Sequence, residues 1–342
     1  MGRRFKRVAA ALAAVTAFAV SACGSGGAGE TASGGGTLSV ALQENYATYL
    51  LEVGIAQGYF KDAGITGLKT TLFTSLPAMF AAVQKGQLDF GMQTMPALAS
   101  FNATAGANPL KSFETFGNTN FWYVGKNSGL PDITSGDWQS IVRSWKGHTI
   151  GVPALGSIME KRLRSMLKTV GLNPDKDVKI AVAGVATSAA ALEKGVVDVV
   201  TVTTPNAAQI ETKSLGRLAV NDESGPEEFR GLIATSLYFT AGSSLKARPG
   251  FYQKIATGME KARAFVTDPK NKETCVRVLS DKVGLSPAIA AKAYEFDHDG
   301  VAAAKVSEAS YQKSIDSLVS SGIMTRPTPL YKDMIATDSL GG

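Results

Sequence analysis

The same phrase occurs twice in this chain, about one domain's length apart. Residues 81–96 read AAVQKGQLDFGMQTMP, and residues 190–205 read AALEKGVVDVVTVTTP. In both copies a Lys-Gly pair ends a helical pattern, and an aspartate then precedes a strand-like run that leads to a threonine and a proline. The repeat therefore predicts two equivalent α/β units, and local structure explains most of it. Only Thr94, Thr203 and Thr204, at the carboxyl ends of the strands, suggest a function.

Hydrophobic periodicity predicts the elements of the first unit. Strands are expected at 37–42, 68–74 and 88–93, and they alternate with helical patterns at 49–64 and 75–86. A β-α-β-α-β order is typical of a mostly parallel sheet.

The second unit repeats this order and is followed by a helical remainder. Its expected strands and helices lie at 148–153, 157–171, 178–183, 188–195 and 197–202. A strand within 230–242 is then able to cross back to the first unit. Further helices are expected at 249–267, 271–282, 286–295 and 308–320.

The first residues have the pattern of an export signal. A basic start precedes an uncharged, alanine-rich run that is too short to span a bilayer. The following Val-Ser-Ala-Cys resembles the lipobox of bacterial lipoproteins, which implies a signal peptide at 1–22 and a lipid on Cys23. A plain secretory signal with a chance cysteine is the alternative. The segment 23–36 is rich in Gly, Ser and Ala, which predicts a flexible tether.

Loss of this signal changes the charge balance of the chain. The formal net charge of +6 includes the four basic residues of the signal, so +2 remains, and no nucleic-acid partner is indicated. Cys275 would then be the one unmodified cysteine, which excludes a disulfide within the mature chain, and its helical spacing predicts a buried thiol. No cofactor is expected, because the glycine-rich match to a dinucleotide fingerprint at 24–29 lies in the tether and not between a strand and a helix.

The loops after the predicted strands are the expected place for a ligand, because open α/β sheets bind ligands beyond the carboxyl ends of their strands. These loops are rich in hydroxyl and amide groups and contain no arginine or lysine. Backbone N–H groups at helix starts bind anions without a basic side chain, so an anionic ligand is expected, although the serines could act only as helix caps. The candidate ligand-binding residues of these loops are Gln43, Glu44, Asn45, Tyr46, Thr74, Ser75, Gln93, Thr94, Ala154, Gly156, Ser157, Thr187, Ser188, Thr203 and Thr204.

Four candidates leave the chemistry of the ligand open. Glu44 would favour a ligand that also carries an amine if it points inward, and it has no bearing on the ligand if it points outward. Asn120, Trp122 and Tyr238 lie near the expected crossings between the two units. The aromatic residues there are expected to pack the hinge. If they stack on the ligand instead, the ligand is larger and flatter, such as a pyrimidine or an aromatic sulfonate.

Longer phrases carry a resemblance to a known family. GYFKDAGI at 58–65, the first copy of the repeat, and SWKGHTIGVPALGS at 144–157 resemble substrate-binding proteins of the nitrate/sulfonate/taurine class of ABC importers. The resemblance extends over residues 37–340. One departure is His148, which stands where the family usually has a lysine.

The resemblance implies a periplasmic-binding-protein type II fold, in which two doubly wound α/β lobes are joined by two crossing strands and hold one small molecule between them. The first lobe is then expected to comprise residues 37–124 and 233–342, and the second lobe residues 125–232.

The same resemblance implies a function. It implies a monomeric lipoprotein on the extracytoplasmic face of the cell membrane that captures a small organic or inorganic anion and delivers it to an ABC permease. Gln43 matches a glutamine found in aliphatic-sulfonate binders, which favours an aliphatic sulfonate or a taurine-like solute. A binder of a pyrimidine or aromatic solute and a lipid-anchored sensor of the same fold are the alternatives.

An enzyme is not expected. The two histidines, His148 and His298, lie far apart in the sequence. The three consecutive residues Asp297 to Asp299 cannot readily converge on one metal ion, so no metal site is expected. Gly-x-Ser-x-Gly, Cys-x-x-Cys and Gly-Lys-Ser/Thr motifs are missing. Pyrimidine-precursor synthases share the implied fold, but they are cytosolic, whereas this chain begins with an export signal.

Overall fold

The computed structural model describes residues 36–43, 45–104, 106–116, 119–227, 236–297, 307–320, 322 and 324–336. The expected signal peptide, Cys23, all of the tether except Gly36, and Glu44 lie outside the described residues.

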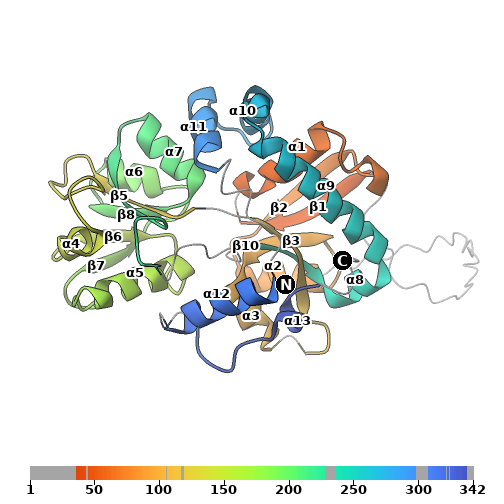
Figure 1. Ribbon diagram of the computed structural model, residues 1–342, viewed down its shortest axis with the longest axis horizontal. Helices are drawn as coiled ribbons and strands as arrows, with labels where there is room; N and C mark the ends of the chain where they lie inside the picture. Colours follow the sequence, from red (N-terminus) through yellow and green to blue (C-terminus); the bar gives the residue numbers. More distant parts are fainter. Residues whose placement is uncertain are drawn as a thin grey trace, which may run out of the picture. The chain divides into compact units, whose positions relative to one another are not determined.

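The described chain is organised around two five-stranded mixed sheets (Figure 1). The first sheet has the strand order β2-β1-β3-β10-β4 and contains β1 (Thr37–Leu42), β2 (Gly67–Leu72), β3 (Phe90–Thr94), β4 (Leu110–Phe116) and β10 (Ser236–Ala241). The second has the order β7-β6-β8-β5-β9 and contains β5 (Phe121–Gly125), β6 (Thr149–Val152), β7 (Lys179–Val182), β8 (Val199–Val202) and β9 (Gly216–Asn221). In each sheet three parallel strands are followed by one strand that is antiparallel to both neighbours.

The antiparallel strand of each sheet is the first strand after a crossing between the two units. β5 follows β4 in sequence but pairs with β8 and β9 of the second sheet. β10 follows β9 but pairs with β3 and β4 of the first sheet. This topology confirms the expected fold of two α/β units linked by crossings. It also corrects one expected boundary: residues 121–124 were assigned to the first lobe, but they form β5 of the second sheet, so the first crossing lies between Phe116 and Phe121.

Helices cover both faces of each sheet. Those around the first sheet are α1 (Tyr49–Ala56), α2 (Leu76–Gln84), α3 (Met95–Asn102), α8 (Gly242–Ala247), α9 (Pro249–Thr267), α10 (Lys272–Asp281), α12 (Glu308–Ser320) and α13 (Tyr331–Met334). Those of the second unit are α4 (Trp138–Arg143), α5 (Ile158–Thr169), α6 (Ser188–Glu193) and α7 (Thr204–Thr212). The helices predicted at 249–267 and 308–320 have the predicted bounds, and that predicted at 271–282 is α10, which is one residue shorter at each end.

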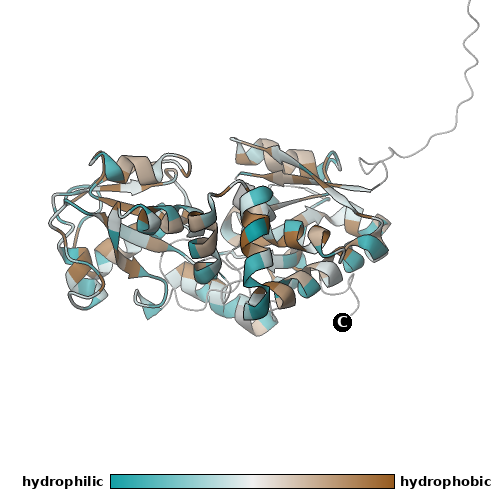
Figure 2. Ribbon diagram, turned by 90° about the horizontal axis from the view of Figure 1, so that it is seen from above, coloured by the Kyte–Doolittle hydropathy of each residue, from teal (hydrophilic) through white to brown (hydrophobic). Residues whose placement is uncertain are grey.

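Alternation along the strands divides each core into two layers. In β1, Leu38, Val40 and Leu42 pack with residues of α1 and α9, whereas Ala41 faces the layer of α2 and α3. The helices accordingly carry hydrophilic and hydrophobic residues along the same ribbon (Figure 2). The inner parallel strands β1, β6 and β8 are almost wholly buried, which explains their short, nearly continuous apolar runs in the sequence, whereas the edge strands β2 and β7 are partly exposed.

The aspartate of the repeated phrase joins the third parallel strand of each sheet to the first. Asp89 Oδ2 accepts hydrogen bonds from Ser39 N at 2.9 Å and Ser39 Oγ at 2.7 Å, and Asp89 Oδ1 pairs with Arg248 at 3.1 Å. At the equivalent place in the second sheet, Asp198 Oδ2 accepts from Thr149 N at 2.9 Å. These contacts lie at the amino ends of the strands, so the aspartate of the repeat is structural in both units.

The phrase GYFKDAGI also has a structural role. The Phe60 side chain is fully buried and fills the space beside two helix glycines, because a Cβ on Gly54 of α1 would lie 2.5 Å from the ring and one on Gly258 of α9 would lie 2.3 Å from it. Gly64 then ends the phrase with a φ of +75°, a backbone conformation that favours glycine.

Helix α11 (Pro287–Asp297) packs against α7 of the second unit as well as against α10. Lys292 of α11 pairs with Glu211 at 3.0 Å, and the buried Asp297 accepts a hydrogen bond from Thr204. The sequence assigned this helix to the first lobe with the rest of 233–342. Its packing shows that it contacts both units.

Candidate ligand-binding site

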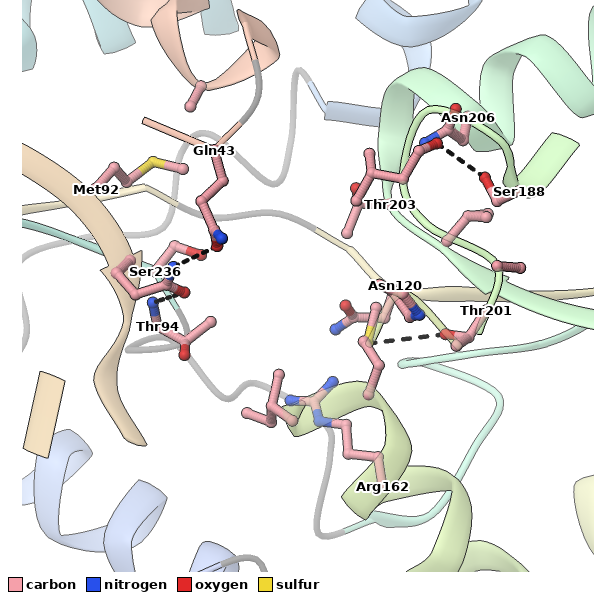
Figure 3. Close-up of a pocket in the computed structure, with 18 residues that line it drawn as sticks. Gln43, Met92, Thr94, Asn120, Arg162, Ser188, Thr201, Thr203, Asn206 and Ser236 are labelled. Carbon is pink, nitrogen blue, oxygen red and sulfur yellow. Dashed lines mark hydrogen bonds between the residues drawn. The ribbon is translucent and has the colours of Figure 1, made fainter. Parts of the chain in front are cut away.

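One pocket lies at the carboxyl ends of the parallel strands and takes its lining from both sheets (Figure 3). Its cavity volume is about 180 Å³, which suits a small molecule. The described residues that line it are Gln43, Ala47, Met92, Gln93, Thr94, Asn120, Pro153, Ile158, Met159, Arg162, Ala183, Val185, Ser188, Thr201, Val202, Thr203, Asn206 and Ser236.

The first sheet contributes amide and hydroxyl groups. Gln43 directly follows β1, and Gln93 and Thr94 end β3 beside it. Ser236 begins β10 opposite Thr94 because these two strands are antiparallel. Figure 3 shows Gln43, Met92, Thr94 and Ser236 on one side of the pocket.

The two glutamines hold each other in place. Gln93 Nε2 donates to Gln43 Oε1 at 2.8 Å, and Gln93 Oε1 accepts from Thr94 N at 2.8 Å. With its oxygen engaged in this way, the Gln43 side chain keeps its amide nitrogen as a donor at the pocket.

The second sheet contributes the opposite wall. Thr201 and Thr203 come from β8 and its carboxyl end, and Asn206 lies in the first turn of α7. Ser188 begins α6, and its hydroxyl donates to Val185 O at 3.1 Å. Apolar side chains alternate with these groups, so the pocket has both polar and apolar surface.

The two threonines of the repeated phrase occupy equivalent places. Thr94 is the residue before α3 and Thr203 the residue before α7, and both have extended backbone angles. Neither side chain makes a capping hydrogen bond to its helix, and both line the pocket. Helices α3 and α7, with eight and nine residues, therefore begin at the pocket. The backbone N–H groups at the start of each helix that lack an intrahelical partner favour negative charge there.

Arg162 is the one ionisable residue among the described residues that line the pocket. It reaches the pocket because Ile158, Met159 and Arg162 lie on one side of α5 at i, i+1 and i+4. Its side chain is 1% exposed, and Nη1 pairs with Asp222 Oδ1 at 3.0 Å. The other carboxylate oxygen, Asp222 Oδ2, accepts from Asn120 N at 3.1 Å and Asn120 Nδ2 at 2.8 Å. Burial raises the pKa of Asp222, and the charge of Arg162 and the Asn120 hydrogen bonds oppose this rise.

Six of the predicted site residues line the pocket, and the others with described side chains do not. Those that line it are Gln43, Gln93, Thr94, Asn120, Ser188 and Thr203. Those placed elsewhere are Thr74, Ser75, Trp122, Ala154, Gly156, Ser157, Thr187, Thr204 and Tyr238. Glu44 lies outside the described residues, and Asn45 and Tyr46 are described only as the backbone of a 3-10 turn, Asn45–Thr48.

The displaced candidates have local structural partners. Ser157 caps α5 by accepting from Glu160 N at 3.3 Å, and Ser75 caps α2. Trp122 is fully buried on the α5 side of the second sheet. Tyr238 is fully buried in the core of the first unit, where its hydroxyl donates to Ala47 O at 3.1 Å. Trp122 and Tyr238 thus lie in the cores of the two units, and neither lines the pocket.

Arg162 was not among the predicted site residues because it lies within helix α5 and not in a loop that follows a strand. A sequence signal for Arg162 does exist. The helix predicted at 157–171 starts at a candidate site loop, and Arg162 lies one helical turn after Ile158, near the start of that helix.

The described residues include neither a metal-binding cluster nor a helix that could cross a membrane. Among them no group of three or more His, Cys, Asp or Glu side chains is placed to hold a metal ion. None of the helices in this part of the chain combines the length and apolarity that a membrane span requires.

Solved structures with a similar fold cover nearly the whole described chain. The alkanesulfonate-binding protein SsuA from Xanthomonas axonopodis pv. citri, bound to MOPS, is 17% identical with a TM-score of 0.67, covering 89% of this chain and 99% of that chain. The periplasmic aliphatic sulphonate binding protein SsuA from Escherichia coli is 18% identical with a TM-score of 0.64, covering 87% and 97%. The periplasmic nitrate-binding protein NrtA from Synechocystis PCC 6803 is 13% identical with a TM-score of 0.63, covering 86% and 83%.

These neighbours confirm the fold class that the sequence predicted. A comparison with curated proteins gave no significant match. Residues 37–280, which are more than half of the sequence, match the NMT1-like family. The chain belongs to the NMT1-like family.

Proposed function

We propose that this protein is the solute-binding component of an ABC importer and that it captures a small anion, most simply an aliphatic sulfonate or a taurine-like compound. The observation that carries the proposal is the composition of the pocket: amides, hydroxyls, two helix N-termini and one arginine gather at the carboxyl ends of both sheets.

These groups suffice for micromolar binding of an anion. Each helix N-terminus contributes about 0.3–1 kcal/mol, and each hydrogen bond to a charged group contributes about 1.5–3 kcal/mol. A dissociation constant of 1 μM corresponds to about −8 kcal/mol. Four or five such contacts from Gln43, Thr94, Thr203 and Asn206 are therefore enough, even after part of the energy is spent on ordering the ligand.

Three observations support an aliphatic sulfonate over a flat aromatic solute. Two of the structural neighbours are sulfonate-binding proteins by name, and a third is a nitrate-binding protein. Among the described lining residues there is no aromatic side chain on which a pyrimidine or an aromatic sulfonate would stack. The apolar surface of Met92, Ile158 and Met159 suits a short alkyl chain.

Binding without catalysis is proposed for the same site. Apart from Arg162, the described lining residues carry no ionisable group that could serve as a general acid or base. Closure of the two units around the solute is the hinge mechanism of binding proteins, and the closed form would dock on a permease.

The proposed location is the extracytoplasmic face of the cell membrane. The lipobox-like Val-Ser-Ala-Cys and the tether support anchoring by a lipid on Cys23, with the protein acting as a monomer. A lipid-anchored sensor of the same fold would share this location but would bind a receptor in place of a permease.

A thermal-shift panel tests the proposed ligand class. The panel comprises taurine, ethanesulfonate and longer alkanesulfonates, nitrate, bicarbonate, aromatic sulfonates and thiamine pyrimidines. A ligand at about 100 times its dissociation constant adds about 2.7 kcal/mol of stability, which raises the midpoint by about 5 °C. A response to an alkanesulfonate or to taurine supports the proposal. A response only to pyrimidines or aromatic sulfonates contradicts the ligand class, and no response to any compound contradicts the role as an anion binder.

A further inference from the structure

A buried carboxylate lies directly behind the cation of the pocket. Asp222 follows β9, is not itself a lining residue, and pairs with Arg162 of α5 at 3.0 Å. The side chains of Arg162 and Asp222 are 1% and 13% exposed, so water screens this pair only weakly. Because the pair carries one charge of each sign, the charge that Arg162 brings to the pocket is compensated at close range.

The same carboxylate also holds a second lining residue. Asp222 Oδ2 accepts from both the backbone N and the side-chain Nδ2 of Asn120, which lies at the first crossing. Asp222 therefore fixes the orientation of two pocket residues that are far apart in sequence, one with each carboxylate oxygen.

This arrangement has a consequence for ligand charge. A simple monoanion beside Arg162 is attracted by the guanidinium and repelled by the carboxylate behind it, so its net electrostatic gain is reduced. A zwitterion carries its own positive group, which the carboxylate attracts. The pair therefore penalises the monoanion relative to the zwitterion of the same skeleton.

We propose that Asp222 is a positioning residue that sets the charge selectivity of the pocket, disfavouring simple monoanions relative to zwitterions. This inference rests on the proposed function, because it concerns the ligand class of the same site. It assigns a role to a residue that does not touch the ligand and acts through Arg162 and Asn120.

Calorimetric titration of two matched probes tests the inference. Ethanesulfonate and taurine share a two-carbon skeleton and a sulfonate, and taurine alone carries an ammonium group. Both are titrated at pH 7 and low salt into the wild-type protein, Asp222→Asn and Asp222→Glu. The replacement by asparagine keeps the size and removes the charge, whereas the replacement by glutamate keeps the charge.

The expected result is a change in the ratio of the two dissociation constants. In Asp222→Asn the ratio shifts at least tenfold towards ethanesulfonate, which corresponds to about 1.4 kcal/mol, and in Asp222→Glu it stays near the wild-type value. If the role of Asp222 were purely structural, Asp222→Asn would weaken the binding of ethanesulfonate and of taurine by the same factor. A ratio in Asp222→Asn within twofold of the wild-type ratio overturns the inference.

Two further arms keep the test decisive. If Asp222→Asn fails to fold, Asp222→Ser replaces it as a second uncharged variant: the ratio again shifts at least tenfold towards ethanesulfonate, and a ratio within twofold of the wild-type value overturns the inference. If the wild-type protein binds neither sulfonate, the proposed sulfonate class is wrong, and nitrate is titrated as the probe. Nitrate binding gained by Asp222→Asn relative to wild type then supports the inference, and the absence of any gain overturns it.

Discussion

Replacing Asp89 by alanine is expected to destabilise the protein much more than the same change at Asp198, its counterpart in the repeated phrase. Both residues join the start of a third parallel strand to the first strand, so the repeat itself supplies a matched control. The Asp89 side chain is 1% exposed, whereas the Asp198 side chain is 35% exposed. The two positions thus differ mainly in burial and in the number of partners.

The magnitudes follow from the contacts. Loss of the Asp89 carboxylate leaves two buried donors of Ser39 without this acceptor, at about 1–3 kcal/mol each, and breaks the pair with Arg248. Breaking a buried ion pair by removing one partner costs about 3–5 kcal/mol, and we expect Asp89→Ala to fall in this range. Asp198→Ala removes the acceptor of Thr149 N and the 3.3 Å contact with His148 Nδ1, both at a place that water reaches, so we expect about 1 kcal/mol.

Urea unfolding followed by far-ultraviolet circular dichroism measures both free energies of unfolding. Circular dichroism is preferred to fluorescence because the three tryptophans, Trp122, Trp138 and Trp145, all lie in the second unit, away from Asp89. A difference of about 2 kcal/mol or more between the two variants is expected. Equal losses of stability would refute the reasoning that burial and partner number set the cost of this aspartate.

Three further perturbations separate packing, binding and anchoring. Gly258→Ala places a Cβ 2.3 Å from the Phe60 ring and 2.8 Å from a backbone oxygen, so it should lower the free energy of unfolding by about 2 kcal/mol, as measured by thermal unfolding. Gly250→Ala in the same helix places its Cβ where no atom lies within 4 Å, so it should be neutral or stabilise by about 0.5 kcal/mol. Equal effects of the two variants would contradict the packing around Phe60. Thr203→Val should weaken binding of an identified ligand at least tenfold, as measured by calorimetry, because Thr203 lines the pocket. Ser75→Ala should lower the free energy of unfolding by about 0.5–1 kcal/mol and leave the affinity unchanged, because Ser75 caps α2. The reverse pattern would contradict the placement of the binding site. Cys23→Ser should release the protein from the membrane fraction into the soluble fraction, and continued membrane association would contradict the lipid anchor.

Much of the fold could be predicted because its signals are local. The helical and strand periods, the Lys-Gly helix ends and the aspartate of each repeat all act within about fifteen residues. The strands β4, β5 and β9 were not predicted individually because their places depend on pairing with partners from the other half of the chain. For the same reason the boundary at residue 124 was wrong, since nothing local in Phe121 to Val124 tells which sheet will accept the strand.

The candidate site shows the same division. Thr94 and Thr203 could be placed at the pocket because the carboxyl ends of parallel strands converge at one edge of a sheet. Trp122 could not be placed, because the pleat of β5 decides which face each residue takes, and one step along the strand changes the face. Arg162 depends on the rotation of α5 and on Asp222, sixty residues further along the chain, so only the folded structure brings it to the pocket.

The most direct test of the proposed site is calorimetric titration with the ligand of the panel that binds best. It is performed on the wild-type protein and on Asn206→Leu. Asn206 lines the pocket from the first turn of α7, and leucine removes its amide without shortening the side chain. We expect one ligand per chain in the wild type, at least tenfold weaker binding in Asn206→Leu, and the same unfolding midpoint for both proteins without ligand. Equal affinity in both proteins would contradict the assignment of this pocket as the binding site.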